Sequence, residues 1–161
     1  MPTSVAQAIK DQFEFESSKG TVSAITDRRI TAETCKKYNV TVTTNDDGDI
    51  THHQYPYYDK NNALVAYKTR EVASKGFRTS GSWPITGLFG QQLFNSPSKF
   101  ITICEGELDA LACHQMLGNY PVVSIRNGAA SALKDCKRSL QFLDMFDNVV
   151  ICFDTDTAGR K

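Results

Sequence analysis

The sequence predicts an α/β domain with a parallel sheet in its second part, preceded by a small α+β lobe. The main observation is that the apolar runs at residues 100–104, 121–125 and 148–153 are continuous rather than alternating. Continuous runs are typical of strands covered on both faces, as in a parallel sheet between layers of helices. Before these runs the elements are short and separated by turn clusters. We therefore expect a first lobe at residues 1–97 and an α/β domain at residues 98–161.

In the first lobe the pattern predicts two helices and an antiparallel meander. The helices are expected at residues 4–13 and 30–38, the second with Thr31 as its N-cap. Three strands are expected at residues 40–44, 49–58 and 63–70, separated by the turn clusters "NDDGD" and "DKNN". A connecting loop, "SGSWPITG", follows them.

In the second domain the segments between the apolar runs have helical spacing. We expect two apolar stripes, one formed by Leu108, Leu111, Ala112 and Met116, the other by Leu133, Cys136, Leu140 and Leu143. Three strands joined by two helical crossovers form a β-α-β-α-β unit, whose crossovers should be right-handed.

The overall composition limits the possible partners. Eighteen basic and eighteen acidic side chains cancel, so any interaction with nucleic acid must come from a local surface. The apolar runs of about five residues are far too short to cross a membrane, and the N-terminus lacks the apolar core of a signal peptide. We expect a cytoplasmic protein with no membrane partner.

Cysteine and histidine usage indicates neither zinc nor disulfides. The five cysteines are widely spaced and form no CxxC pair, which argues against a structural zinc ribbon and against a disulfide framework. Cys104 and Cys152 lie inside apolar runs, so we expect both to be buried thiols. His52 and His53 would point to opposite faces of a strand, which disfavours a histidine metal site.

Acidic residues follow two of the predicted parallel strands. Glu105 comes directly after the first strand and Asp154 after the third, with Asp156 two positions later. Ligands collect at the carboxyl ends of the strands in such sheets. Two carboxylates about 5 Å apart repel by about 3 kcal/mol, so a hard cation such as Mg²⁺ is the natural companion. The alternative is that Asp154 and Asp156 only cap a helix beginning near Thr157.

These residues carry a resemblance to a known family. The segments "CEGELDALA" and "VVICFDTDTAGRK" resemble the Toprim domain, a Rossmann-like fold shared by primases, topoisomerases and some nucleases. The segments "AITDRRITAETCKKYNV", "AYKTR", "KGFRTSGSWPITGLFGQQLF" and "RNGAAS" resemble the polymerase domain of phage-type primase–helicases, which are relatives of Twinkle. The resemblance covers residues 24–161.

The resemblance implies roles for the acidic residues. Glu105 would be catalytic near the primer 3′ hydroxyl, and Asp154 and Asp156 would bind Mg²⁺ (or Mn²⁺) together with Glu105. Gly106 would let the backbone approach the ligand closely. The turn that contains Arg126 and Gly128 would contact nucleotide phosphates through its amides, or it is an ordinary strand-to-helix turn.

The first lobe contains a local excess of cations. Between Asp59 and Gly81 there are five basic and two acidic side chains, which gives a local charge of 5 − 2 = +3. Four of the basic residues form a predicted basic patch for template and nucleotide: Lys68, Arg70, Lys75 and Arg78. Tyr67, Phe77 and Trp83 lie nearby in sequence, and mixed cations and aromatic rings suit single-stranded nucleic acid. A solvated strand face is the alternative.

We therefore expect a DNA primase core that makes short RNA primers on single-stranded DNA by metal-dependent nucleotidyl transfer. The expected partners are the single-stranded template, ribonucleoside triphosphates and a replicative helicase domain, fused or separate. Two alternatives stay open: a Toprim-type nuclease, and a non-catalytic single-stranded DNA-binding module of a helicase. Compared with the family the chain lacks a Cys₄ zinc module, a Walker motif, the last Toprim helix, a fourth strand and a third acid. A fragment or a shortened gene product is expected.

Overall fold

The computed structural model describes residues 4–7, 10, 14, 20–118 and 120–156. The helix predicted at residues 4–13 lies largely outside this part, as do Thr157, Arg160 and Lys161. The chain forms two compact units, one of Met1–Ile25 with Thr31–Thr86 and one of Thr26–Ile30 with Gly87–Lys161. The boundary expected at residues 97 and 98 was drawn from strand patterns and stays a prediction.

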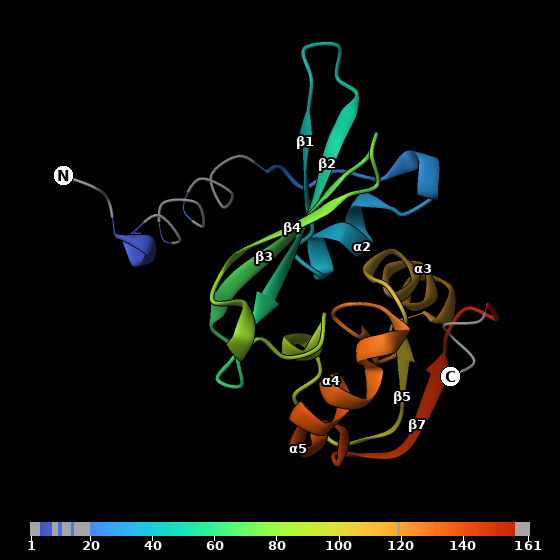
Figure 1. Cartoon of the computed structure of the whole chain (residues 1–161). Coiled ribbons are helices and arrows are strands. Elements are labelled where there is room, and N and C mark those ends of the chain that lie inside the picture. Colours follow the sequence, from blue (N-terminus) through green and yellow to red (C-terminus); the bar gives the residue numbers. More distant parts are fainter. Residues whose placement is uncertain (1–3, 8–9, 11–13, 15–19, 119, 157–161) are drawn as a thin grey trace. The chain divides into compact units, whose positions relative to one another are not determined.

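The first unit is a four-stranded antiparallel sheet preceded by a short helix (Figure 1). Helix α2 (Ala32–Lys37) has Thr31 as its N-cap, as predicted, because the Thr31 side chain accepts from the Thr34 N–H at 3.2 Å. The strands pair in sequence order: β1 (Thr41–Thr44), β2 (Ile50–Tyr58), β3 (Leu64–Glu71) and β4 (Phe77–Gly81). Strand β4 was not predicted, and the expected connecting loop begins within it, at Ser80.

The two turn clusters of this unit close as their composition predicts. The Asn45 Oδ1 accepts from the N–H groups of Asp47 and Asp49, and the Asp59 Oδ1 accepts from those of Asn61 and Ala63. Short amide and carboxylate side chains satisfy turn backbones in this way. The register then places β2 residues opposite β3 residues, for example Tyr55 opposite Lys68.

The second unit is a three-stranded parallel sheet with helical crossovers. The strands are β5 (Ser98–Cys104), β6 (Val122–Ser124) and β7 (Phe146–Cys152), in the order β6-β5-β7. Helix α3 (Glu107–Leu117) connects β5 to β6, and α4 (Ala132–Arg138) with α5 (Leu140–Leu143) connects β6 to β7. The predicted parallel sheet is therefore confirmed, and β5 is its central strand. Four short 3₁₀ helices complete the described elements: Thr26–Arg28, Trp83–Ile85, Gln91–Leu93 and Ala129–Ser131.

Strand β7 differs from the expectation of strands covered on both faces. Ile101 and Ile103 of β5 and Val122 and Val123 of β6 are fully buried, whereas Ile151 of β7 is 57% exposed. Within the part of the chain that the structure describes, β7 pairs with β5 alone and is an edge strand. For the same reason Cys152 is exposed rather than buried; Cys104 is buried as predicted.

The predicted helical stripes are correct only in part. In α3 the buried side chains are Glu107, Ala110, Leu111 and His114, spaced as one helical face, whereas Met116 is 79% exposed. The second stripe assumed one continuous helix, but α4 ends at Arg138 and α5 begins at Leu140. The two helices therefore do not share one continuous stripe, and Leu133 and Leu140 are both exposed. None of the described helices is long and apolar enough to cross a membrane.

Candidate functional site

The carboxyl ends of β5 and β7 lie side by side. Cys104 and Cys152 are register partners, so Glu105 and Asp154 leave the sheet at the same edge, as predicted. The Asp154 N–H donates to Glu105 Oε2 at 3.2 Å. The chain crosses from β6 to β7 over the central strand β5. In an open α/β sheet such a change in strand order marks the crevice where ligands bind.

The other Glu105 oxygen contacts the turn that follows β6. The Ala129 N–H donates to Glu105 Oε1 at 3.4 Å. Before it, Gly128 has φ 76° and ψ 175°, a conformation that is essentially restricted to glycine. A Cβ at Gly128 would lie 3.9 Å from Glu105 Oε1. The Glu105 carboxylate, directly after the central strand, therefore accepts hydrogen bonds from backbone that follows each of the two neighbouring strands.

A third acid, Asp109, belongs to the same place. Partial burial of the carboxyl group, then the charge of Asp154, and also the charges of Glu105 and Glu107, raise the pKa of Asp109, against a lowering hydrogen bond from the Gly106 backbone. The residue as a whole is exposed. A Cβ at Gly106 would lie 3.0 Å from Asp109 Oδ2, so any larger residue here would require this carboxylate to move by a few tenths of an ångström. Asp109 was not predicted as a site residue, although its place four residues after Glu105 is a usable signal.

We call Glu105, Asp109 and Asp154 the acid cluster. Asp156 is exposed and lies two residues beyond Asp154, at the end of the described chain. Among the described residues no three His, Cys, Asp or Glu side chains lie close enough to hold a metal ion. The chemistry of the cluster nevertheless fits a hard cation, because all its donors are carboxylates. The charges of Asp154 and Glu105, after partial burial, also raise the pKa of Asp109.

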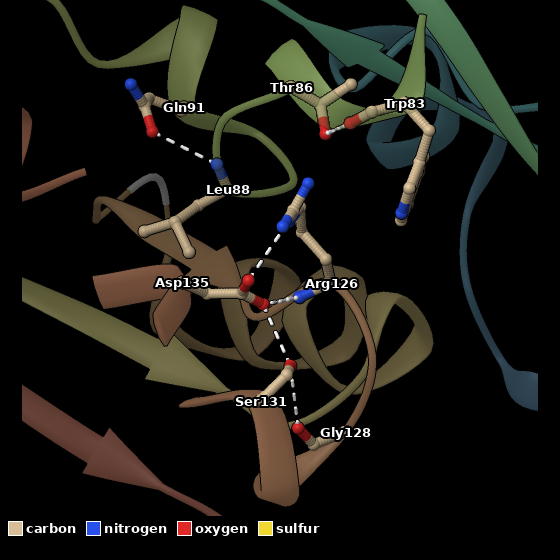
Figure 2. A network of polar contacts seen from close by, with 8 residues as sticks. All are labelled: Trp83, Thr86, Leu88, Gln91, Arg126, Gly128, Ser131 and Asp135. Carbon is tan, nitrogen blue, oxygen red and sulfur yellow. Dashed lines mark hydrogen bonds and ion pairs between the residues drawn. The ribbon is translucent and has the colours of Figure 1, made fainter. Parts of the chain in front are cut away.

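Arg126 lies in a buried ion pair that the sequence did not reveal (Figure 2). Its Nε donates to Asp135 Oδ1 at 3.0 Å, and its backbone N–H donates to Asp135 Oδ2 at 2.8 Å. The side chains of Arg126 and Asp135 are 6% and 1% exposed. The contacts of Arg126 and Gly128 with a nucleotide stay predictions.

In the first unit Lys68 and Arg70 are two residues apart on β3 and share one face of the strand. The Lys68 Nζ lies 4.5 Å from the centroid of the Phe77 ring, and the Arg70 Cζ lies 5.9 Å from it. These are distances at which a ring face attracts a cation. The Phe77 side chain is 54% exposed, whereas Lys68 is only 8% exposed.

The other two members of the basic patch lie elsewhere on this unit. Lys75 is exposed in the turn before β4, with φ 58°. Arg78 is exposed and is the register partner of Thr69, so it lies on the opposite face from Phe77. Of the nearby aromatic residues, Tyr67 is buried, and Trp83 packs edge-on against Tyr57 with ring centroids 4.7 Å apart. Trp83 thus contributes to packing within this unit.

The fold and the acid cluster define a Toprim protein, and the comparisons agree. Residues 102–161 match the family model "Toprim-like", and residues 20–81 match "Bacteriophage T7 DNA helicase/primase, N-terminal a+b fold". The chain is 36% identical over 152 residues to a DNA helicase/primase of Enterobacteria phage T3, which covers 94% of this chain and 26% of that protein.

Two solved structures give a similar result. The primase fragment of the bacteriophage T7 primase–helicase is 38% identical with a TM-score of 0.77, over 88% of this chain and 58% of that chain. The second is a structure of the T7 lagging-strand DNA polymerase interacting with primase domains of two gp4 subunits, bound to an RNA/DNA hybrid and dTTP. One of its chains is 37% identical with a TM-score of 0.76, over 88% of this chain and 70% of that chain. The chain belongs to the Toprim-domain DNA primases of the phage T7 type. It spans about a quarter of the T3 relative's length, at 26%.

Proposed function

We propose that this chain carries the polymerase core of a DNA primase and joins ribonucleotides on a single-stranded DNA template. The observation that carries the proposal is the meeting of Glu105 and Asp154 at the ligand-binding edge of a Toprim sheet, with Asp109 beside them. An ordinary helix cap explains one acid at one strand end. It does not explain three acids from three different parts of the chain whose like charges repel one another.

Toprim primases are metal-dependent in general, and here the donors would be Asp154, Asp156, Asp109 and Glu105. Mg²⁺ or Mn²⁺ in such a site would neutralise phosphate charge during nucleotidyl transfer. Glu105 would accept the proton of the attacking 3′ hydroxyl. The backbone N–H groups of Ala129 and Asp154 hold the Glu105 carboxylate in one orientation, so its side chain would not need to reorganise during the reaction.

The first unit would hold the polyanionic substrates. Lys68 and Arg70 flank the exposed ring of Phe77, and an exposed ring beside cations suits a base and its phosphate. Lys75 and Arg78 would add long-range attraction to the template. The structure that contains the T7 primase domains, with the T7 DNA polymerase, also contains an RNA/DNA hybrid and dTTP, and the T3 relative is a helicase/primase. A helicase domain, fused or separate, is therefore the partner we propose.

Product analysis tests the proposal. The 161-residue chain, alone and fused to the region that follows the matched segment in the T7 fragment, is incubated with single-stranded DNA, labelled ribonucleotides, a primer and Mg²⁺. We expect template-directed extension by the fused protein, lost with Glu105→Gln. Degradation of the template without incorporation would instead make the protein a Toprim nuclease. Binding without either reaction would make it a non-catalytic module.

A further inference from the structure

The turn that supplies an N–H group to Glu105 is fixed by one residue that no part of the proposed function uses. Strand β6 ends at Ser124, and the Ile125 N–H still donates to the Cys104 carbonyl at 3.1 Å. The chain then turns through residues 126–131 into α4. At the start of this turn the sheet therefore defines the backbone. The turn itself is closed by a backbone hydrogen bond from the Ser131 N–H to the Gly128 carbonyl at 3.0 Å and is joined to α4 by side chains.

Three donors of the turn converge on the Asp135 carboxylate, as Figure 2 shows. The backbone N–H and the Nε of Arg126 donate to its two oxygens at 2.8 and 3.0 Å. The Ser131 hydroxyl lies 2.9 Å from Asp135 Oδ2 and 3.1 Å from the Gly128 carbonyl, between which its single hydrogen is shared. Asp135 thus joins both ends of the turn to helix α4.

Stability alone does not account for this arrangement. The carboxylate and guanidinium are almost completely buried, and taking both charges out of water costs as much as their attraction returns. Apolar side chains of similar volume often give equal or greater stability at such positions. An ion pair with an added hydroxyl instead determines the backbone conformation, because all these hydrogen bonds are satisfied together in only one backbone arrangement.

The arrangement that Asp135 selects is the one in which Ala129 meets Glu105. Gly128 adopts φ 76° and ψ 175°, so the backbone here is at an uncommon conformation that needs support on both sides. The Ala129 N–H follows directly and donates to Glu105 Oε1. We propose that Asp135 is a positioning residue, which fixes the turn at residues 126–131 and so orients the Glu105 carboxylate. The importance of Glu105 rests on the proposed function; the contact itself does not.

The test separates positioning from stability with two variants of the 161-residue chain. Asp135→Asn keeps the volume and removes the charge, and Arg126→Met with Asp135→Leu replaces the pair by apolar side chains. Urea unfolding gives the stability of each. The amide shift of Ala129, recorded with and without Glu105→Gln, reports the contact, and titration with Mn²⁺ gives the affinity of the acid cluster. Asp144→Asn, an exposed acid of the same unit, is the matched control.

We expect the apolar pair to restore the stability that Asp135→Asn loses, without restoring the contact. In that double variant Glu105→Gln should no longer shift the Ala129 amide, and Mn²⁺ affinity should fall by up to about tenfold, as for other residues that orient ligands indirectly. In the fused protein kcat should fall. Control values should equal those of the wild type.

The inference is overturned if the double variant folds and Glu105→Gln still shifts the Ala129 amide as in the wild type, with unchanged Mn²⁺ affinity. If the double variant does not fold, Ser131→Ala decides. It removes one hydrogen bond of Asp135 and leaves the ion pair, so a weakened Ala129 response supports positioning and an unchanged one contradicts it. Failure of the fused protein to incorporate ribonucleotides would refute the proposed function and leave the amide measurement valid.

Discussion

The backbone N–H of Asp154 donates to the side chain of Glu105 at 3.2 Å, although the two residues follow different strands of the sheet. The register of β5 and β7 produces this contact, because Cys104 and Cys152 are partners and the next residues leave the sheet together. Asp109 then comes close to both from the first turn of α3. The acid cluster is therefore a product of strand order.

Binding of a divalent cation should stabilise the protein. At a Mn²⁺ concentration one hundred times its dissociation constant, the free energy of unfolding should rise by about 2.7 kcal/mol. Asp154→Asn should reduce this gain, because a ligand is lost. Asp147→Asn removes an exposed acid near the start of β7, the strand that Asp154 follows, and should leave the gain unchanged. Urea unfolding with Mn²⁺ and with a chelator measures the gain, and equal gains in both variants would rule out Asp154 as a ligand.

Asp109→Asn should stabilise the metal-free protein at neutral pH. Burial and the neighbouring charges raise the pKa of Asp109 from its ordinary value of 3.8. The folded protein therefore binds this proton more tightly than the unfolded chain, and stability falls as the pH rises from the unfolded to the raised folded value. Above this window the ionised carboxylate costs stability, and the amide removes the cost.

The pH dependence of unfolding checks this sign. The advantage of Asp109→Asn should disappear when the pH falls below 3.8, the ordinary value, because both states are then protonated. Saturating Mn²⁺ should reverse the order of the two proteins at neutral pH. A variant that is less stable than the wild type in chelator at neutral pH would contradict this account of Asp109.

Replacing Lys68 and Arg70 with Ala should weaken binding to single-stranded DNA. The slope of log affinity against log salt should decrease by about 0.7 for each lost phosphate contact. The matched control is Lys36→Ala with Lys37→Ala, which removes the same charge from exposed positions of α2 in the same unit. Fluorescence anisotropy at several salt concentrations measures both. Equal losses of affinity in the two proteins would show that replacing Lys68 and Arg70 acts only through net charge.

Gly128→Ala should affect both stability and the acid cluster. Its backbone conformation costs an L-residue about 1–3 kcal/mol, and the turn next to Glu105 must shift. Gly48→Ala is the control, because Gly48 also has a positive φ, of 86°, but a Cβ there would meet nothing within 4 Å. Both variants should unfold at lower urea concentration. Only Gly128→Ala should also weaken Mn²⁺ binding. Identical Mn²⁺ affinities of the two variants would show that the turn at Gly128 does not influence the acid cluster.

The sequence predicted the sheet and its acidic edge because both follow from local patterns. Continuous apolar runs indicate parallel strands, and parallel strands end at one edge. The predicted basic pair was also correct in its geometry, because residues two apart on a strand share a face. Lys68 and Arg70 indeed lie over one ring.

What the sequence did not reveal depends on partners distant along the chain. Nothing local connects Arg126 with Asp135, so Arg126 was interpreted only as a ligand contact. Helical spacing predicts which residues share a helix face, but not whether another element packs on that face. Leu133 and Leu140 are exposed for this reason. An apolar run likewise does not say whether a strand is central, and β7 is at the edge within the described chain. Asp109 was not predicted as a site residue, because acids are common in the first turn of any helix, where the dipole favours them.

The most direct test of the central claim is ribonucleotide incorporation by the fused protein on a single-stranded template, measured with and without Glu105→Gln at increasing Mn²⁺. We expect template-directed products whose yield rises with Mn²⁺ in the wild type. The variant should give no products at any Mn²⁺ concentration, while its far-UV spectrum stays native. The amide preserves volume and removes only charge and basicity. Undiminished incorporation by Glu105→Gln would contradict the claim that this edge of the sheet is the catalytic site.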